Sequence, residues 1–324
     1  MSAVQNNLVP AQPHIQYHPD FEKYQDRTRR RQETETLQDT VPVGFPRKLN
    51  SPLVWEGKDI EKLDDWIYHL SDVQLDEIDK GLQSFKSAFR AISPWVTSAT
   101  LHSLFLLFTR SFEISPRRSR PAEALSFFGG LRIDDYSRED NIMIYAGVSS
   151  HSGNIRGPQQ DTRLENGTSP IISHIKDLTG IVDEDKIGAP SNTADKQVFH
   201  TDAGDIVSLL CLGPAAEAGE SYLSSSGHVY NILAKERPDL IHTLSQDWPV
   251  DGFNNPQKPY TLRPLLYHQA ATATTPERVL IQYARRYFTG FQAQPRSKDI
   301  PPITEALDAL HILAEKHRAA LDFQ

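Results

Sequence analysis

The sequence has little cysteine and no long apolar run. Cys211 is the one cysteine among 324 residues, which excludes an internal disulfide framework and a zinc site built from cysteines. It lies in the apolar run SLLCL, so we expect a buried, inert thiol. The longest apolar stretch, LFLLF at 104–108, is far too short to cross a bilayer, and the N-terminus carries no secretory pattern. We therefore expect a cytoplasmic protein without a membrane partner.

Positive charge is outnumbered, with 34 Lys and Arg against 42 Asp and Glu. The net charge of −8 argues against a nucleic-acid partner, which would need clustered positive charge. The one basic run, RTRRR at Arg27–Arg31, lies in a polar segment and is expected to be a solvated arm. No G-x-S-x-G occurs, so a serine hydrolase with a nucleophile elbow is disfavoured.

The composition changes near residue 50. Residues 1–50 are rich in Gln, Pro, Thr and Arg and show no sustained period, so we expect an N-terminal arm that is loosely ordered or draped over the body. Residues 51–324 are expected to form a single domain. Within it, residues 154–196 are dense in Gly, Asn, Asp and Pro and are expected to be loops.

Apolar periodicity predicts the secondary structure of this domain. Ser71 and Gln74 form a capping box before an amphipathic helix. Helices are predicted at 71–89, 137–153, 228–236, 238–246 and 304–321. Strands are predicted at 198–200, 205–212, 219–225, 260–268 and 278–288, the last two paired. The irregular alternation of strands and helices argues against a doubly wound parallel sheet.

The triplet His200-Thr-Asp202 is the strongest chemical feature. In an extended chain alternate side chains share a face, so His200 and Asp202 would point the same way and Thr201 the other. Such a pair can be an ion pair or hydrogen-bonded pair, a base with its orienting carboxylate, or two ligands of a metal. A non-haem Fe(II) centre uses two His and one carboxylate, and a zinc-dependent hydrolase is a further alternative.

Several segments resemble the taurine dioxygenase/clavaminate synthase-like (TauD-type) family of Fe(II)/2-oxoglutarate oxygenases, in particular its fungal members. They cover about two thirds of the chain in the order of the family: 51–71, 136–159, 199–249, 260–268 and the segment around 285–290. The resemblance implies an α+β, mainly β fold, namely a double-stranded β-helix (a cupin-like jelly roll) with flanking helices. It also implies Fe(II), the co-substrate 2-oxoglutarate, O₂ and a small-molecule substrate, an acid or amino acid by analogy.

The resemblance assigns roles to five residues. His200 and Asp202 would be the first two iron ligands. Ser221 matches a hydroxyl residue near the 2-oxoglutarate carboxylate, although an ordinary strand serine is an equal alternative. Arg285 or Arg286 would meet a substrate carboxylate, because a guanidinium offers a bidentate fork. For at least one of the two, a surface or structural ion pair is the favoured alternative.

The sequence departs from the family at two places. The family's distal His ligand and 2-oxoglutarate-binding Arg follow the helix that corresponds to 304–321, whereas this sequence stops at Gln324 and its late histidines (His268, His311 and His317) do not match the distal position. We therefore expect a jelly roll lacking its last strands, without a third ligand. The Pro/Arg-rich run before SFFGG also contradicts the family pattern, so residues 104–130 suggest an altered reading frame, with a divergent relative as the alternative.

The function expected from the sequence is oxidation of a substrate C–H bond, by hydroxylation or a related reaction. The alternative is a catalytically inactive relative that acts as a binding or scaffold protein. If the chain ends as written, we expect little or no turnover, because two ligands hold Fe(II) weakly and the co-substrate lacks its arginine.

Overall fold

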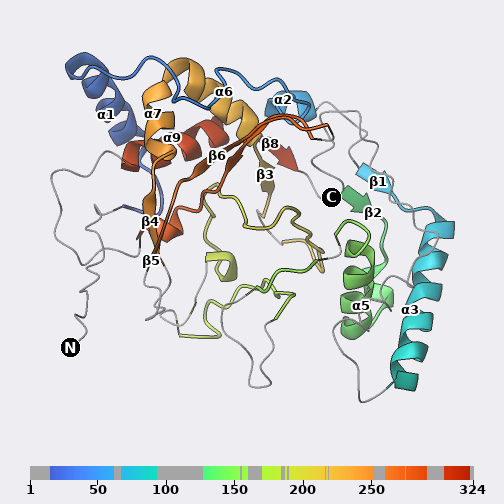
Figure 1. The fold of residues 1–324 in the computed structure, drawn as a ribbon. Helices are drawn as coiled ribbons and strands as arrows, with labels where there is room; N and C mark the ends of the chain where they lie inside the picture. The colour runs from blue at the N-terminus through green and yellow to red at the C-terminus, as the bar shows by residue number, and fades with distance from the viewer. Residues whose placement is uncertain are drawn as a thin grey trace, which may run out of the picture. The chain divides into compact units, whose positions relative to one another are not determined.

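The chain folds into two compact units in the computed structural model, shown in Figure 1. The model describes residues 15–61, 67–92, 127–153, 155–159, 170–183, 187, 190–215, 217, 219–251, 260–273, 275–289 and 303–321. The first unit consists of Met1–Lys62, Lys196–Ala203 and Glu220–Phe323, and the second of Leu63–Asp195, Gly204–Gly219 and Gln324. The domain boundary predicted at residue 50 stays a prediction.

The first unit holds the larger hydrophobic core. Its described helices are α1 (Phe21–Thr34), α2 (Gly57–Ile60), α6 (Ser226–Glu236), α7 (Pro238–Leu244), α8 (Arg286–Thr289) and α9 (Ile303–Lys316). Its described strands are β3 (Ser221–Leu223), β4 (Trp248–Asp251), β5 (Tyr260–Arg263), β6 (Leu266–Gln269), β7 (Arg278–Ile281) and β8 (Ala319–Leu321). The predicted helical pair is confirmed as α6 and α7, with Pro238 in the first turn of α7, where a missing N–H costs nothing.

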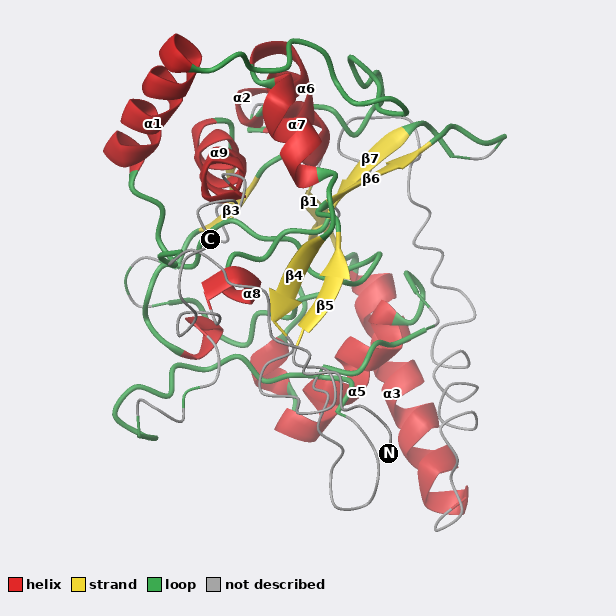
Figure 2. Cartoon of the chain, turned by 60° about the vertical axis from the view of Figure 1, so that its left-hand side comes forward, coloured by secondary structure: helices red, strands yellow, loops and turns green. Residues whose placement is uncertain are grey.

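Helix α9 is buried on nearly all sides. Apolar residues spaced three and four apart, including Ile303, Leu307 and Leu310, lie in the core, and the helix packs against α1, α6 and α7. Figure 2 shows α9 beside α1 and α7. Glu305 and Asp308 are also buried, at 0% and 3% exposure. A buried carboxylate is costly unless it is paired, so these two need cationic partners.

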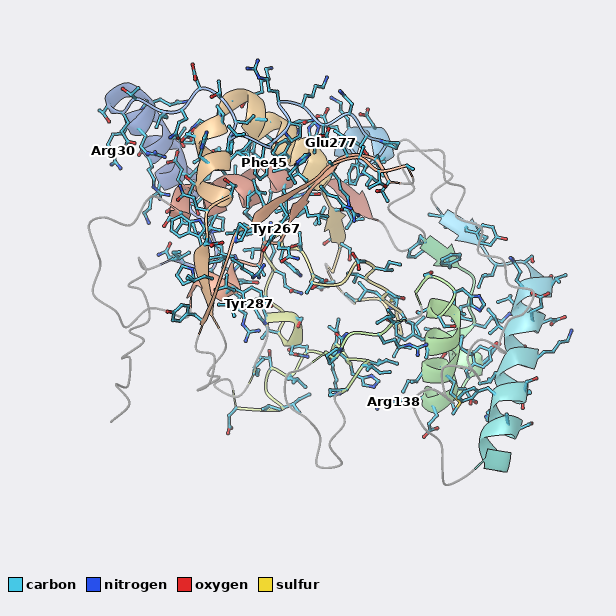
Figure 3. The ribbon with its side chains drawn as sticks, in the orientation of Figure 1. Arg30, Phe45, Arg138, Tyr267, Glu277 and Tyr287 are labelled. Carbon is cyan, nitrogen blue, oxygen red and sulfur yellow. The ribbon has the colours of Figure 1, made fainter. Side chains whose placement is uncertain are left out.

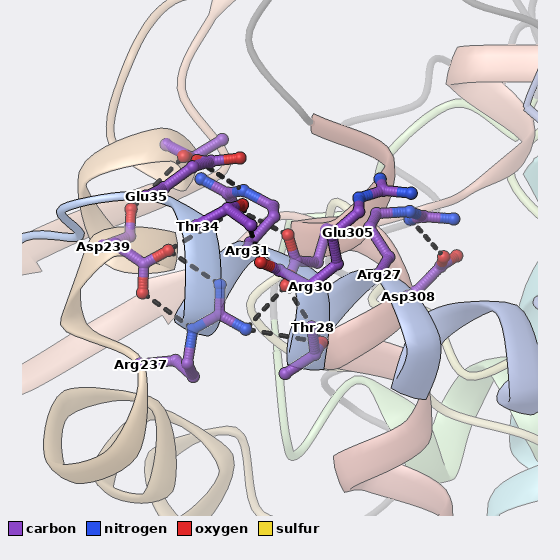
Figure 4. A network of polar contacts seen from close by, with 11 residues as sticks. Arg27, Thr28, Arg30, Arg31, Thr34, Glu35, Arg237, Asp239, Glu305 and Asp308 are labelled. Atoms are coloured by element: carbon purple, nitrogen blue, oxygen red, sulfur yellow. Dashed lines mark hydrogen bonds and ion pairs between the residues drawn. The ribbon is translucent and has the colours of Figure 1, made fainter.

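Arginines from α1 and from the α6–α7 junction supply those partners, as Figure 4 shows. Arg31 and Arg237 both donate to the Glu305 carboxylate, and Arg27 Nη1 lies 3.0 Å from Asp308 Oδ2. The expectation that the RTRRR run is a solvated arm is therefore wrong for Arg27 and Arg31. Within the N-terminal segment, Phe21–Thr34 forms helix α1, which docks on α9.

Residues between α1 and α2 run along α6. The rings of Phe45, labelled in Figure 3, and Tyr230 stack with centroids 6.4 Å apart. The Tyr230 hydroxyl donates to the carbonyl of Pro46 at 2.5 Å. The Asn231 side chain bonds both the N–H and the carbonyl of Leu49, at 2.7 and 3.0 Å. This part of the N-terminal segment lies against the body of the first unit.

The described strands pair two by two, and in this part of the chain they form no closed barrel. Three pairs are antiparallel (β3–β8, β4–β5 and β6–β7) and β1–β2 is parallel. The strand predicted at 219–225 is confirmed by β3, and the predicted pairing across residues 269–277 by β6 and β7. The helix predicted to reach residue 321 ends at Lys316, because Ala319–Leu321 pairs with β3 instead.

The second unit is built around two packed helices. Its described elements are β1 (Ile67–His69), α3 (Asp72–Ile92), β2 (Phe127–Gly129), η3 (Ile133–Asp135), α5 (Arg138–Ser149) and η5 (Pro190–Asn192). Ile78, Leu82 and Phe85 of α3 pack with Ile144 of α5. Lys86 Nζ lies 2.8 Å from an Asp140 carboxylate oxygen, which adds an ion pair between the same helices.

Local signals predicted these helices correctly. The capping box forms: the Ser71 N–H donates to Gln74 Oε1 at 3.0 Å, and the Gln74 N–H to Ser71 Oγ at 3.4 Å. Helix α5 is capped by Ser137 as predicted but ends at Ser149, earlier than expected. Of the segment 104–130, residues 104–126 lie outside the described residues, and Phe127–Gly129 is strand β2.

The apolar run 205–212 differs from its prediction. It is not a strand, and Ile206, Val207 and Leu209 are more than half exposed, because no described strand pairs with this segment. The predicted burial of Cys211 is wrong for the same reason: its thiol is exposed and lies 3.3 Å from the carbonyl of Gly213. Among the described residues, no helix has the length and apolar character needed to cross a membrane.

Candidate functional site

The strand predicted at 198–200 is not formed, and the His200-Thr-Asp202 triplet lies in no helix or strand. The Thr201 N–H donates to the carbonyl of Tyr283 at 2.7 Å, and the Tyr283 N–H donates to Thr201 Oγ1 at 2.8 Å. Thr201 is half-buried against this neighbour, whereas His200 and Asp202 are exposed. This alternation of burial leaves an imidazole and a carboxylate on the solvent side.

The His200 ring is oriented by its own backbone. Nδ1 lies 2.9 Å from the carbonyl oxygen of Val198, which is buried. Because a carbonyl only accepts hydrogen bonds, Nδ1 carries the proton in this contact, and Nε2 carries the lone pair. A histidine held through Nδ1–H to a carbonyl is the form that ligates a metal through Nε2.

His311 supports the backbone next to this ring. The Phe199 N–H donates to His311 Nδ1 at 3.1 Å, and His311 Nε2 lies 3.1 Å from a Glu315 oxygen. Burial lowers the pKa of His311 to about 4, so the ring is neutral at neutral pH and can accept from Phe199. Sequence reasoning considered His311 only as a distal ligand. The one signal for its positioning role was its place on the apolar face of α9, four residues after Leu307.

The other residues singled out from the sequence lie in different environments. Ser221 is half-buried on β3, opposite Leu321 of β8. Arg285 is 2% exposed, with Nε donating to the carbonyl of Gln16 at 2.6 Å and Nη2 2.6 Å from Asp308 Oδ1. This is the structural ion pair considered for one of the two arginines. Arg286 is half-buried at the start of α8.

Three ligands are expected of a non-haem Fe(II) centre, and the triplet contains two residues of a suitable type. In the described part of the chain, no group of three His, Cys, Asp or Glu ligand atoms within 4.8 Å of one another includes His200 or Asp202. His268, which the sequence analysis set aside as a distal ligand, lies 2.9 Å from Glu277. His200 and Asp202 are of donor types that a metal accepts, and among the described residues no third donor is grouped with them.

A hollow of about 290 Å³ lies in the second unit and is separate from the residues discussed above. Its lining residues are Ile133, Asp134, Tyr136, Arg138, Asn141 and Leu212. It includes none of the site residues proposed from the sequence.

Comparison with known proteins identifies the family. Residues 119–324 match the family described as "Taurine catabolism dioxygenase TauD, TfdA family". The chain belongs to this family. The matched region contains the His200-Thr-Asp202 triplet, Ser221 and both arginines. Enzymes of this family generally use Fe(II) and 2-oxoglutarate, and the family implies a cupin-like jelly roll.

Two relatives extend the comparison. The chain is 30% identical over 291 residues to "Taurine hydroxylase-like protein SAT17" of Stachybotrys chartarum, which covers 87% of this chain and 71% of the relative. It is 24% identical over 191 residues to "FR-33289 synthase" of Streptomyces rubellomurinus, covering 58% of this chain and 52% of that protein. The chain thus spans about half the length of the second relative.

Proposed function

We propose that the protein is an Fe(II)/2-oxoglutarate-dependent oxygenase that oxidises a C–H bond of a small organic substrate. The observation that carries the proposal is the family match over residues 119–324, which includes His200 and Asp202. The orientation of the His200 ring, with Nδ1 on the Val198 carbonyl, supports it. The fold proposed for the complete site is a double-stranded β-helix, of which the described two-stranded sheets would be parts.

The proposed roles follow from position and chemistry. His200 Nε2 and the Asp202 carboxylate would hold Fe(II), which together with 2-oxoglutarate supplies activation of O₂. Thr201 fixes the register of both ligands through its bonds to Tyr283. Ser221 is proposed to bond the co-substrate carboxylate. Arg286 is proposed to meet a substrate carboxylate.

His311 and Arg285 are proposed to hold the backbone next to the site residues. His311 holds the Phe199 N–H, one residue before the first ligand. Arg285 is paired with Asp308 and buried, so its part is to anchor the chain that precedes α8. Substrate binding in this proposal therefore falls to Arg286. The substrate class is a small acid, in keeping with the taurine in the name of the fungal relative.

Formation of succinate from 2-oxoglutarate tests the proposal. Purified protein would be incubated with Fe(II), O₂ and 2-oxoglutarate, with and without a panel of small sulfonic, carboxylic and amino acids. We expect succinate that depends on Fe(II) and rises with at least one acid. Asp202→Ala should abolish it, whereas Asp205→Asn, an exposed carboxylate three residues away, should retain it.

Two results would favour other functions. Absence of succinate with every acid, while iron binding persists, would favour a catalytically inactive relative that acts as a binding or scaffold protein. Zinc-dependent hydrolysis without a need for 2-oxoglutarate would favour the hydrolase alternative.

A further inference from the structure

Two histidines and a glutamate converge in the first unit, and none of the three is a residue proposed to bind iron. Glu56 directly precedes α2, His228 lies in the first turn of α6, and His317 follows the last residue of α9. One potential ligand atom of each lies within 4.8 Å of the other two. The two imidazole rings are 4.9 Å apart between centroids, and His317 Nδ1 lies 3.4 Å from Glu56 Oε1.

The backbone around Glu56 and His317 is held in place before any ligand binds. The Gly57 N–H donates to the carbonyl of His317 at 3.1 Å, and α2 packs beside β8 (Figure 1). A Cβ on Gly57 would lie 1.9 Å from the carbonyl oxygen of Arg318, a distance that no side chain tolerates. A glycine is therefore required next to Glu56 for this segment to approach the end of α9.

The segment around His228 shows the same close approach. A Cβ on Gly227 would lie 2.9 Å from Val54 Cγ2. Ser225 caps α6 by accepting from the His228 N–H at 3.1 Å, and its hydroxyl donates to the carbonyl of Leu53 at 2.6 Å. These contacts fix the start of α6 against the residues that lead to Glu56.

The donor atoms are suited to a cation. His228 Nε2 is buried and has no hydrogen-bond partner among the described residues, which is costly for a ring nitrogen unless a ligand occupies it. Lys58 Nζ lies 2.7 Å from Glu56 Oε2, so Oε1 is the carboxylate oxygen directed at His317.

We propose that Glu56, His228 and His317 form a divalent zinc site that joins the start of α2, the start of α6 and the end of α9. Two imidazoles and one carboxylate suit Zn²⁺, with a water in the fourth position, whereas Mg²⁺ and Ca²⁺ prefer oxygen ligands throughout. By the Irving–Williams order this set binds Zn²⁺ more tightly than Fe²⁺. The site is independent of the proposed oxygenase activity.

A structural role follows from the elements that the ion would connect. His317 lies two residues before β8. Strand β8 pairs with β3, which is the strand that carries Ser221. A ligand that binds the folded chain and not the unfolded one stabilises the fold. Zinc at this site would therefore hold β8 and the end of α9 against α2 and α6.

Zinc binding by chelator-treated full-length protein tests the proposal. We expect isothermal titration with ZnCl₂ to show a single tight site, and saturating zinc to raise the melting temperature. His317→Ala and Glu56→Gln should each weaken zinc binding by ~100-fold or more, because loss of even an outer partner of a ligand typically costs about 10–100-fold. Both should also remove the zinc-dependent rise in melting temperature.

Matched controls separate this site from other histidines. His268→Ala disrupts a different His–Glu pair in the same unit and should leave the zinc affinity unchanged. His200→Ala should also leave it unchanged, which distinguishes this site from the proposed iron site. Should Glu56→Gln fail to fold, Co²⁺ titration of wild type against His317→Gln gives the same comparison through visible absorption. Zinc affinity retained in His317→Ala, or no stabilisation of wild type by saturating zinc, would overturn the proposal.

Discussion

Replacing Glu305 by alanine should strongly destabilise the first unit. The carboxylate is fully buried and accepts from Thr28 Oγ1 at 3.0 Å, from Arg237 Nη1 at 2.6 Å and from Arg31. Burial alone would raise the pKa of Glu305, but the hydrogen bonds from Arg237 and Arg31 outweigh it and leave the pKa lowered. The carboxylate is therefore charged at neutral pH and compensates two guanidinium groups.

The size of the effect depends on what those arginines retain. Removing one partner of a buried ion pair typically costs about 3–5 kcal/mol, because the other charge is left without compensation. Arg237 keeps two bonds of 2.8 Å to Asp239, and Arg31 keeps one of 2.9 Å to Glu35. We therefore expect Glu305→Ala to lower the free energy of unfolding by about 3 kcal/mol, at the low end of that range.

Urea unfolding followed by circular dichroism measures the change. The matched control is Glu35→Ala, which removes an ion pair to the same Arg31 from a side chain that is 48% exposed, and it should cost less than about 1 kcal/mol. Glu305→Gln separates charge from shape and should lie between the two. If Glu305→Ala unfolds within about 1 kcal/mol of wild type, the docking of α1 on α9 does not depend on this network and our reasoning is wrong.

Three further predictions rest on single groups. Because the pKa of His311 is lowered to about 4, the unfolded chain takes up a proton between pH 6.5 and 4 while the folded chain does not. The free energy of unfolding, measured by urea titration, should therefore fall by about 3 kcal/mol over that window. The His311→Gln variant should not show this fall. Cys211 should react with an alkylating reagent in the native protein about as fast as in urea, and protection in the native state would contradict its exposure. Gly57→Ala should lower the urea midpoint by the equivalent of about 1–3 kcal/mol, because the added Cβ meets the Arg318 carbonyl, and an unchanged midpoint would show that this approach is not tight.

Elements whose signals are local could be predicted from the sequence. Helix α3 begins at a capping box, and α6 and α7 carry a serine cap and a first-turn proline, so their starts depend on residues within a few positions. Pairing of β6 with β7 was also predictable, because the two strands are joined by a short connection.

Features that depend on distant residues could not be predicted. The sequence predicted solvent exposure for Arg27 and Arg31, because their partners Asp308 and Glu305 lie more than 270 residues away along the chain. Whether the segment around Cys211 is buried depends on whether a neighbouring strand pairs with it, and the periodicity of the sequence does not predict that pairing.

The candidate sites divide in the same way. His200 and Asp202 are two residues apart, so alternation along an extended chain suggested a shared face. Glu56, His228 and His317 have no spacing pattern at all and are brought together only by the packing of α2, α6 and α9. The hydrogen bond from the Phe199 N–H to His311 likewise forms only when α9 packs against the segment that contains Phe199.

Anaerobic Fe(II) binding in the presence of 2-oxoglutarate tests the central claim most directly. Equilibrium dialysis would be done on the His317→Ala background for every variant, so that the Glu56, His228 and His317 group does not contribute. We predict that 2-oxoglutarate strengthens Fe(II) binding by wild type, that His200→Ala and Asp202→Ala lose this binding, and that His174→Ala, an exposed histidine elsewhere, retains it. Equal Fe(II) binding by wild type and His200→Ala would contradict the assignment of the iron site to this triplet.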